Sequence, residues 1–156
     1  MKIHLIVVGK KMPEWINTGY AEFSKRMPSE LQLNLIEVTP SIRNKATPTK
    51  NNIKEEGERI QSAIPANSKL ITLDEKGKKF SSIDLSKKMQ DWLPQGQDIA
   101  IIIGGADGID PIIKQQADET WSLSSLTMPH ALVRVFIAEQ LYRAWSILKG
   151  HPYHRE

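Results

Sequence analysis

Short apolar runs alternate with amphipathic segments along the whole chain. The apolar runs cover residues 3–8, 33–38, 70–73, 99–103 and 121–123, and a segment whose apolar residues recur at helical spacing follows each of them. Runs of this length are typical of strands buried on both faces of a parallel sheet. Five strand–helix repeats therefore predict an α/β fold, with a mostly parallel sheet of five to six strands and helices on both faces.

Capping residues and helix breakers set the predicted helix boundaries. Proline in a first turn and a polar residue just before it favour a helix start, and Gly or Pro favours its end. The predicted helices span residues 13–27, 48–64, 82–92, 111–118 and 130–148. The last helix is apolar around most of its circumference, which indicates cover on two sides, and in a chain this small the second cover can be a partner subunit.

Charged residues interrupt that last helix in two places. Glu139 and Arg143 lie four residues apart in the order that favours an ion pair on one helix. Arg134 stands alone in an apolar run, so its side chain either extends to the surface or reaches a phosphate. The pair predicts a structural contact, whereas Arg134 is open between structure and binding.

Ligands of parallel sheets bind outside the carboxyl ends of the strands, which directs attention to the loops after Leu73, Ile103 and Leu123. The second loop is the turn Gly104–Gly108, where glycines either let the backbone approach a flat or anionic ligand or only close a tight turn. It is neither a Walker A sequence nor a dinucleotide fingerprint. The uncharged segment 123–130 suits a heteroaromatic ring between apolar walls, unless its hydroxyls only cap their own backbone.

Composition narrows the possible chemistry. The 156 residues predict one domain spanning 1–156, and the absence of cysteine excludes disulfides, thiolate nucleophiles, iron–sulfur clusters and cysteine-type zinc sites. The four histidines lack carboxylates at metal-site spacing, so no metal cofactor is expected. Neither a signal-peptide core nor an apolar stretch of about 20 residues is present, which predicts a soluble cytoplasmic protein with no membrane segment.

The charge is mild but uneven. Lys and Arg number 21 against 18 Asp and Glu, a net charge of +3. Residues 1–80 carry 14 basic and 9 acidic side chains, a balance of +5, and residues 81–156 carry 7 and 9, a balance of −2. The segment 38–54 holds Arg43, Lys45, Lys50 and Lys54 and no acidic residue, so it either lies along phosphates or is a solvated loop.

The tail after the last helix concentrates groups that nucleotides require. Residues 150–156 contain two histidines, a tyrosine and an arginine, which can stack on a base, donate hydrogen bonds and contact phosphate. A metal site on His151 and His154 is the rival interpretation, but two ligands without carboxylates form a poor cage.

Six motifs together resemble one known family. They are Gly-Lys-Lys-Met-Pro at 9–13, Thr-Leu-Asp-Glu-Lys-Gly-Lys at 72–78, Ile-Gly-Gly at 103–105, Ser-Leu-Ser-Ser-Leu-Thr-Met-Pro-His at 122–130, Arg-Ala-Trp-Ser-Ile at 143–147 and His-Pro-Tyr-His-Arg-Glu at 151–156. Over its whole length the chain is similar to the ribosomal RNA large-subunit methyltransferase H family, the pseudouridine-N3 methyltransferases of the SPOUT superfamily. The resemblance implies a C-terminal trefoil knot of SPOUT type, a homodimer, and S-adenosyl-L-methionine as methyl donor.

The same resemblance implies the residues of the cofactor site. Carried over position by position, they are Leu73, Gly104, Gly105, Leu123, Ser124, Ser125, Leu126, Thr127 and Met128. These positions lie in the three loops that the sheet argument selects.

The implied reaction transfers a methyl group from a sulfonium to N3 of a pseudouridine in 23S rRNA. N3 is a weakly acidic imide nitrogen that must lose its proton, so the protein has to align the reactants and assist proton removal. His154 and Arg155 are the candidates for orienting the base and assisting proton loss, and Tyr153 for stacking or hydrogen bonding. His130 is a weaker catalytic candidate.

The tail and the net charge indicate how the subunits and the RNA substrate come together in this reaction. Because the tail follows a helix expected at a subunit interface, we expect it to complete the partner's site. The mild net charge favours a structured target such as the assembled ribosome over a free RNA strand. The alternatives are a SPOUT methyltransferase acting on another RNA position and a noncatalytic nucleotide-binding module associated with the ribosome.

Overall fold

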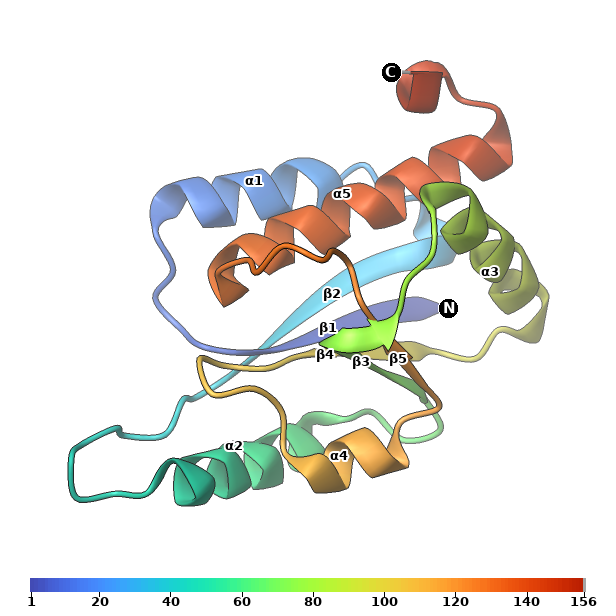
Figure 1. Ribbon diagram of the computed structural model, residues 1–156. Coiled ribbons are helices and arrows are strands. Elements are labelled where there is room, and N and C mark those ends of the chain that lie inside the picture. The colour runs from blue at the N-terminus through green and yellow to red at the C-terminus, as the bar shows by residue number, and fades with distance from the viewer. Residues whose placement is uncertain (156) are drawn as a thin grey trace.

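A computed structural model describes residues 1–155 and has a five-stranded, entirely parallel sheet at its centre (Figure 1). The strand order is β2-β1-β4-β3-β5. The strands are β1 (Lys2–Val8), β2 (Gln32–Val38), β3 (Lys69–Lys78), β4 (Ile99–Ile103) and β5 (Glu119–Trp121). The predicted parallel α/β sheet is therefore confirmed, at the lower of the two strand numbers.

Helices cover both faces of the sheet, as predicted. Figure 1 shows α1, α3 and α5 on one face and α2 and α4 on the other. Their bounds are α1 (Glu14–Ser24), α2 (Thr49–Ala63), α3 (Ser82–Gln95), α4 (Pro111–Gln116) and α5 (His130–Lys149), with two short 3₁₀ turns, η1 (Ser29–Leu31) and η2 (Pro152–Arg155).

Side-chain alternation along the central strands divides the core into two layers. Leu5 of β1 and Ile101 of β4 pack under α1, α3 and α5, while the next residues, Ile6 and Ile102, pack against α2 and α4. All five residues of β4 are buried, as expected of a strand covered on both faces.

Helix α5 is covered on two sides by its own chain. It packs between α1 and α3 and lies over the sheet (Figure 1). Within the helix, Arg143 pairs with Glu139 at 2.7 Å, which confirms the predicted contact. The side chain of Arg134 follows neither predicted course, because it is buried.

The structure corrects several predicted boundaries. Strand β3 continues past Leu73 to Lys78, with an irregular register between these two residues, because both pair with Trp121 of β5. Strand β5 occupies residues 119–121 rather than 121–123, since Ile71 pairs with Glu119 at its start. Helix α1 ends three residues earlier than predicted and α3 three residues later, where a left-handed Gly96 closes it.

Two segments far apart in sequence lie in close contact beside the sheet edge. The segment 74–80 closes over residues 120–125, with Ser122 N–H donating to the Lys78 carbonyl at 2.9 Å. A Cβ atom added to Gly77 would come within 2.6 Å of the Trp121 carbonyl carbon, so only glycine fits there. This contact delivers the chain after β5 to the carboxyl end of the sheet.

Candidate functional site

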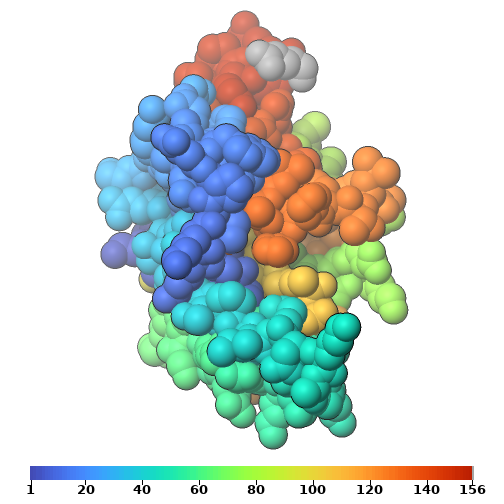
Figure 2. All heavy atoms as spheres, turned by 90° about the vertical axis from the view of Figure 1, so that its left-hand side faces the viewer, coloured from blue at the N-terminus to red at the C-terminus, as the bar shows by residue number. Residues whose placement is uncertain are grey.

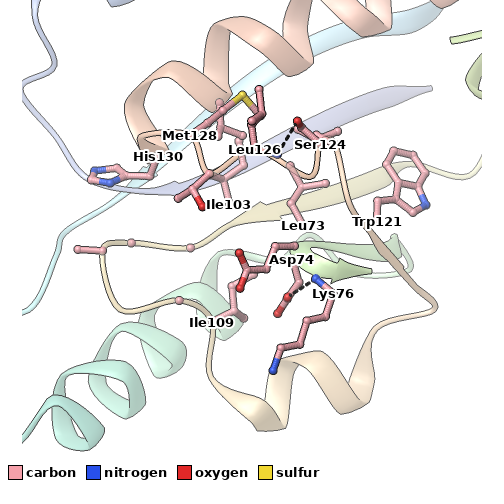
Figure 3. A pocket seen from close by; sticks show the side chains of 18 of the residues that line it. Leu73, Asp74, Lys76, Ile103, Ile109, Trp121, Ser124, Leu126, Met128 and His130 are labelled. Carbon is pink, nitrogen blue, oxygen red and sulfur yellow. Dashed lines mark hydrogen bonds between the residues drawn. The ribbon is translucent and has the colours of Figure 1, made fainter. Parts of the chain in front are cut away.

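A cavity of about 490 Å³ opens at the carboxyl ends of β3 and β4 (Figure 3). Its volume lies within the roughly 300–1,000 Å³ usual for small-molecule sites. Three loops form its walls: the segment after Leu73, the glycine turn after Ile103, and the segment between β5 and α5. The loops chosen from the predicted sheet therefore surround one cavity.

Most of the residues proposed for the cofactor site line this cavity. They are Leu73, Gly104, Gly105, Leu123, Ser124, Leu126, Thr127 and Met128. Ser125 is not among the lining residues, and its hydroxyl instead contacts the Lys79 ammonium. The segment after Leu73 is therefore tied directly to the segment after β5.

The glycines of the turn are required for its own packing. A Cβ on Gly104 would lie 2.7 Å from Ile109 Cγ1 and 2.9 Å from the backbone of Gly108, so the turn closes tightly on itself. Gly105 pairs with Gly108 in an isolated bridge, and its missing Cβ leaves room for Val8. The tight-turn interpretation explains why these residues are glycines, and the absence of side chains leaves their backbone at the cavity wall.

The segment between β5 and α5 combines both interpretations considered for it. Ser124 Oγ accepts a hydrogen bond from the Leu126 N–H at 2.9 Å, and Ser122 Oγ donates to the Ser124 carbonyl at 3.2 Å. The hydroxyls thus cap their own backbone. The segment also lines the cavity, where the side chain of Leu126 is 78% exposed. Large apolar side chains are more often buried, so this one is available to contact a ligand.

Charged side chains at one end of the cavity were not singled out in the sequence. Asp74 accepts a hydrogen bond from the Lys76 N–H at 2.9 Å and pairs with the Lys114 ammonium. These contacts, that of Lys114 first, hold the pKa of Asp74 below its usual range. Glu75 also lines the cavity. The sequence could have indicated Asp74 by its position, because it directly follows the apolar run 70–73 and so lies where a strand of a parallel sheet approaches a ligand.

His130 and Arg134 lie in the first turns of α5, next to the cavity. His130 lines the cavity, as its candidacy requires. Arg134 is 1% exposed and donates to Glu37 at 2.9 Å and to the Gly9 carbonyl at 3.0 Å. Its guanidinium therefore joins α5 to the ends of β1 and β2, instead of reaching a phosphate.

The tail is anchored at the opposite end of α5. The Tyr153 hydroxyl donates to Glu139 Oε1 at 2.9 Å, and its ring packs edge-on against Tyr142 with a centroid distance of 4.8 Å. Burial, followed by the bond to Glu139, raises the pKa of Tyr153 to about 12, so its phenol remains protonated at neutral pH. His154 Nδ1 lies 3.5 Å from the Ser146 hydroxyl, and Arg155 is exposed.

Within one chain, the tail and the cavity are far apart. Helix α5 has 20 residues, and at a rise of 1.5 Å per residue it is about 30 Å long. His130 begins this helix at the cavity, whereas Tyr153, His154 and Arg155 follow its other end (Figure 1). The structure thus brings His130, but not the tail candidates, to the residues that line the cavity.

Neither a metal-binding cluster nor a membrane-spanning helix occurs within residues 1–155. No group of three His, Asp or Glu side chains in this range is arranged to hold a metal ion. No helix in the same range is long and apolar enough to span a membrane.

The parallel sheet and the cavity at its carboxyl edge define an α/β protein with a small-molecule site, and comparison with known proteins identifies its family. Residues 1–154 match the family model described as "Predicted SPOUT methyltransferase". Proteins named "Ribosomal RNA large subunit methyltransferase H" from Hydrogenovibrio crunogenus and Thioalkalivibrio sulfidiphilus are 53% and 49% identical to the chain, and each alignment covers 100% of both sequences. The chain therefore belongs to the SPOUT methyltransferases, in the ribosomal RNA large subunit methyltransferase H family.

Two solved structures share the fold at low sequence identity. A probable methylase family protein from Haemophilus influenzae superposes with a TM-score of 0.55 at 12% identity, covering 97% of this chain and 69% of the other. The tRNA (m1G37) methyltransferase from Aquifex aeolicus superposes with a TM-score of 0.52 at 16% identity, covering 92% and 70%. The trefoil knot is implied by family membership, and the closure of segment 74–80 over residues 120–125 is compatible with it.

Proposed function

We propose that this protein uses S-adenosyl-L-methionine to methylate N3 of a pseudouridine in 23S rRNA, on the assembled ribosome in the cytoplasm. The cavity carries the proposal, because its three loops contain nearly all the residues that the family resemblance assigns to the cofactor. Membership of the ribosomal RNA large subunit methyltransferase H family supports the reaction type and the RNA class.

The residues around the cavity fit this methyl donor. Leu73, Ile103 and Met128 offer apolar surface to an adenine ring, and the backbone of the glycine turn offers polar groups to its edge. Glu75 and Lys76 bring both signs of charge to the same cavity, as the zwitterionic amino-acid end of the donor requires. When bound, the donor supplies a methyl group that its positive sulfur has already activated.

The protein's own residues then have to align the nucleotide and manage one proton. Because the methyl group is already activated, orientation of N3 towards it supplies much of the rate. The N3 proton must leave, and His154 and Arg155 are the groups proposed to assist its loss and to stabilise the charge that develops. Tyr153 is proposed to stack on the base or hydrogen-bond to it. His130, which lines the cavity, is a further candidate for assisting catalysis.

We further propose that the tail acts in the cavity of a partner subunit in a homodimer. The length of α5 separates the tail from the cavity of its own chain, by about 30 Å at 1.5 Å per residue. In a twofold dimer, the same separation can place each tail at the partner's cavity. Each active site would then consist of one subunit's cofactor loops and the other's His154 and Arg155.

Mixed dimers test this arrangement directly. One variant, Thr127→Trp, fills the cavity from an exposed position; the other, His154→Ala/Arg155→Ala, lacks the tail groups. If tails act in the partner, random mixing restores one intact site in half of the dimers, or about a quarter of the wild-type activity. If each tail acts in its own chain, no mixture recovers activity.

The reaction itself is tested on ribosomes from cells that lack this protein. Addition of purified protein and S-adenosylmethionine is expected to add one methyl group to a pseudouridine, located by mass spectrometry of 23S rRNA digests. A methyl group at another position would refute the N3 assignment. Calorimetry without a saturable signal from S-adenosylmethionine would favour a noncatalytic module, and equal activity on short transcripts would refute the ribosome requirement.

A further inference from the structure

The carboxyl edge of the sheet carries a group of lysines that the methyltransferase site does not use. We propose that they form a surface that binds the phosphates of the RNA around the target nucleotide, with Trp15 stacking on an unpaired base. This surface, called the lysine surface below, consists of Lys10, Lys11, Lys45, Lys50 and Lys54. The proposal rests on the proposed function and adds where the RNA lies.

The lysine surface comes from two segments at the same edge of the sheet. Lys10 and Lys11 follow β1, and the other three lie in the loop after β2 and the start of α2. Since β1 and β2 are neighbouring parallel strands, their carboxyl ends are adjacent. Figure 2 shows both segments, in blue and cyan, on one face with the orange segment that lines the cavity. The lysines therefore lie on the face where the cavity opens.

Contacts with the cavity residues fix both segments. Arg134 holds the Gly9 carbonyl, and the position of a Cβ on Gly9 would lie 4.0 Å from Nε2 of His130. Lys11, in the same turn, has a φ of +57°, a left-handed conformation that a lysine adopts only where the surroundings impose it. The turn after β1 is therefore held in a defined shape against the cavity wall.

The loop after β2 is tied to the glycine turn by Arg43. Its guanidinium pairs with the buried Glu56 at 3.1 Å and with Asp107 of the glycine turn at 2.8 Å. The guanidinium of Arg43 is thus occupied by internal ion pairs. By contrast, among residues 1–155 no carboxylate lies within ion-pair distance of any lysine of the lysine surface, and all five lysines are exposed.

Exposed apolar side chains accompany these lysines. Trp15 is 62% exposed at the start of α1, Ile42 is 84% exposed in the loop after β2, and Leu126 is 78% exposed at the cavity. Ile16 and Tyr20 form the buried face of α1, and Trp15 lies outside it. An exposed tryptophan forgoes the stabilisation that burial of its ring would give. Beside lysines that can bind phosphates, its ring can stack on a nucleic-acid base.

The combination of groups selects RNA as the occupant. Flexible ammonium groups without carboxylate partners bind phosphates independently of sequence, and an aromatic ring adds stacking on any unpaired base. The remaining sequence of residues 38–54 contains no acid that would repel a phosphate chain. Specificity would come from the nucleotide inserted in the cavity, while the lysine surface supplies affinity and register.

Charge-removing variants test the surface on 70S ribosomes from cells that lack this protein. In Lys45→Gln/Lys50→Gln/Lys54→Gln, the slope of log affinity against log salt concentration should fall by about 2 to 3, since each lost phosphate contact accounts for about 0.7 to 0.9. KM for ribosomes should rise while kcat and the affinity for S-adenosylmethionine stay unchanged. The matched control Lys2→Gln/Lys25→Gln/Lys87→Gln removes the same charge elsewhere and should leave the slope unchanged.

Substitution of the tryptophan tests the stacking contact separately. Trp15→Ala should weaken ribosome binding roughly 5- to 100-fold with no change in the salt slope, and Trp15→Phe should restore most of the affinity because it keeps an aromatic face. Ile83→Ala, at an exposed apolar residue of α3, is the control and should have no effect.

The outcomes separate this proposal from the proposed function. If wild-type protein methylates ribosomes and the triple variant binds them with the wild-type affinity and slope, the lysine surface is refuted and the function stands. If the wild type neither binds nor methylates ribosomes, both fail. Binding to anionic phosphatidylserine vesicles that depends on the same lysines, with ribosome binding unaffected by their loss, would assign the surface to a membrane and refute the RNA proposal.

Discussion

The two ends of α5 use similar residues in different ways. At the cavity end, polar and apolar side chains from three loops surround a space of about 490 Å³. At the tail end, Tyr153 is consumed by contacts with Glu139 and Tyr142 of its own chain. One chain thus surrounds a cavity at one end of α5 and anchors its tail at the other, about 30 Å away at 1.5 Å per residue. In the proposed homodimer, a second subunit would bring the two together.

Removal of the imidazole of His154 and the guanidinium of Arg155 should have the largest effect. In His154→Ala/Arg155→Ala, single-turnover methylation should fall by about 10²- to 10⁴-fold, the usual contribution of positioned acid–base groups. The affinity for S-adenosylmethionine, measured by calorimetry, should not change because the cavity is intact. Lys149→Ala, an exposed neighbour, serves as control. A wild-type rate in the double variant would show that the tail is only structural.

Loss of the buried guanidinium should have the next largest effect, at the cavity end. Arg134→Met should lower the free energy of unfolding by about 3 kcal/mol, because the Gly9 carbonyl and Glu37 lose a buried partner. The value lies at the low end for a buried pair, since Glu37 is partly exposed. Urea unfolding measures the change, with Arg26→Met at an exposed ion pair as the matched control. An equally stable Arg134→Met protein would contradict the bridging role.

The strand that leads into the cavity should respond to acid. Burial alone would raise the pKa of Glu119, but hydrogen bonds from Lys88, Trp121 and Lys69 lower it to about 2. A lowered pKa means that this stabilisation is complete above about pH 4.5 and is lost as the pH falls towards 2.

Replacement of this carboxylate gives the measurement. Glu119→Gln should lower the free energy of unfolding at pH 7 by on the order of 2 kcal/mol, and the difference from wild type should shrink between pH 5 and pH 2. Urea titrations across this range test it, with the exposed Glu58→Gln as control. A difference that is constant with pH would show that the charge of Glu119 does not matter.

The smallest effect is expected from the tail anchor. Tyr153→Phe loses one hydrogen bond to Glu139 and should cost about 1 kcal/mol. Because the pKa of Tyr153 is raised to about 12, this contribution should be constant up to about pH 10 and decline only above it. Thermal unfolding at pH 7, pH 9 and pH 11 measures the cost, its constancy and its decline. An equally stable Tyr153→Phe protein would show that the hydrogen bond to Glu139 does not anchor the tail.

Much of the fold was predictable because apolar patterning dominates it. Strand β4 was predicted without error, since five consecutive apolar residues between Asp98 and Gly104 are typical of a buried strand. The continuation of β3 to Lys78 was missed because residues 74–78 are charged or glycine, and only pairing with Trp121 holds them in a strand. Local pattern does not contain such long-range pairing.

The candidate site was predictable in part, for a similar reason. The sheet rule selects the loops after the strands, and the family resemblance assigns residues within those loops, most of which line the cavity. Pairing between elements distant in sequence, such as that of Asp74 in β3 with Lys114 in α4, depends on the tertiary arrangement and was missed. The separation of the tail from the cavity could have been predicted, because the expected helix over residues 130–148 already implies a distance of about 28 Å at 1.5 Å per residue.

The contact at Gly77 bears on the order in which the sheet and the cavity form during translation. The backbone of Thr120 and Trp121 occupies the space where any other residue at position 77 would carry its Cβ. The wall of the cavity from Leu123 to Val133 lies beyond this crossing in the chain. Because this part of the wall follows β5, the last strand of the sheet in chain order, a polypeptide emerging during translation can complete the cavity only after all five strands have been made.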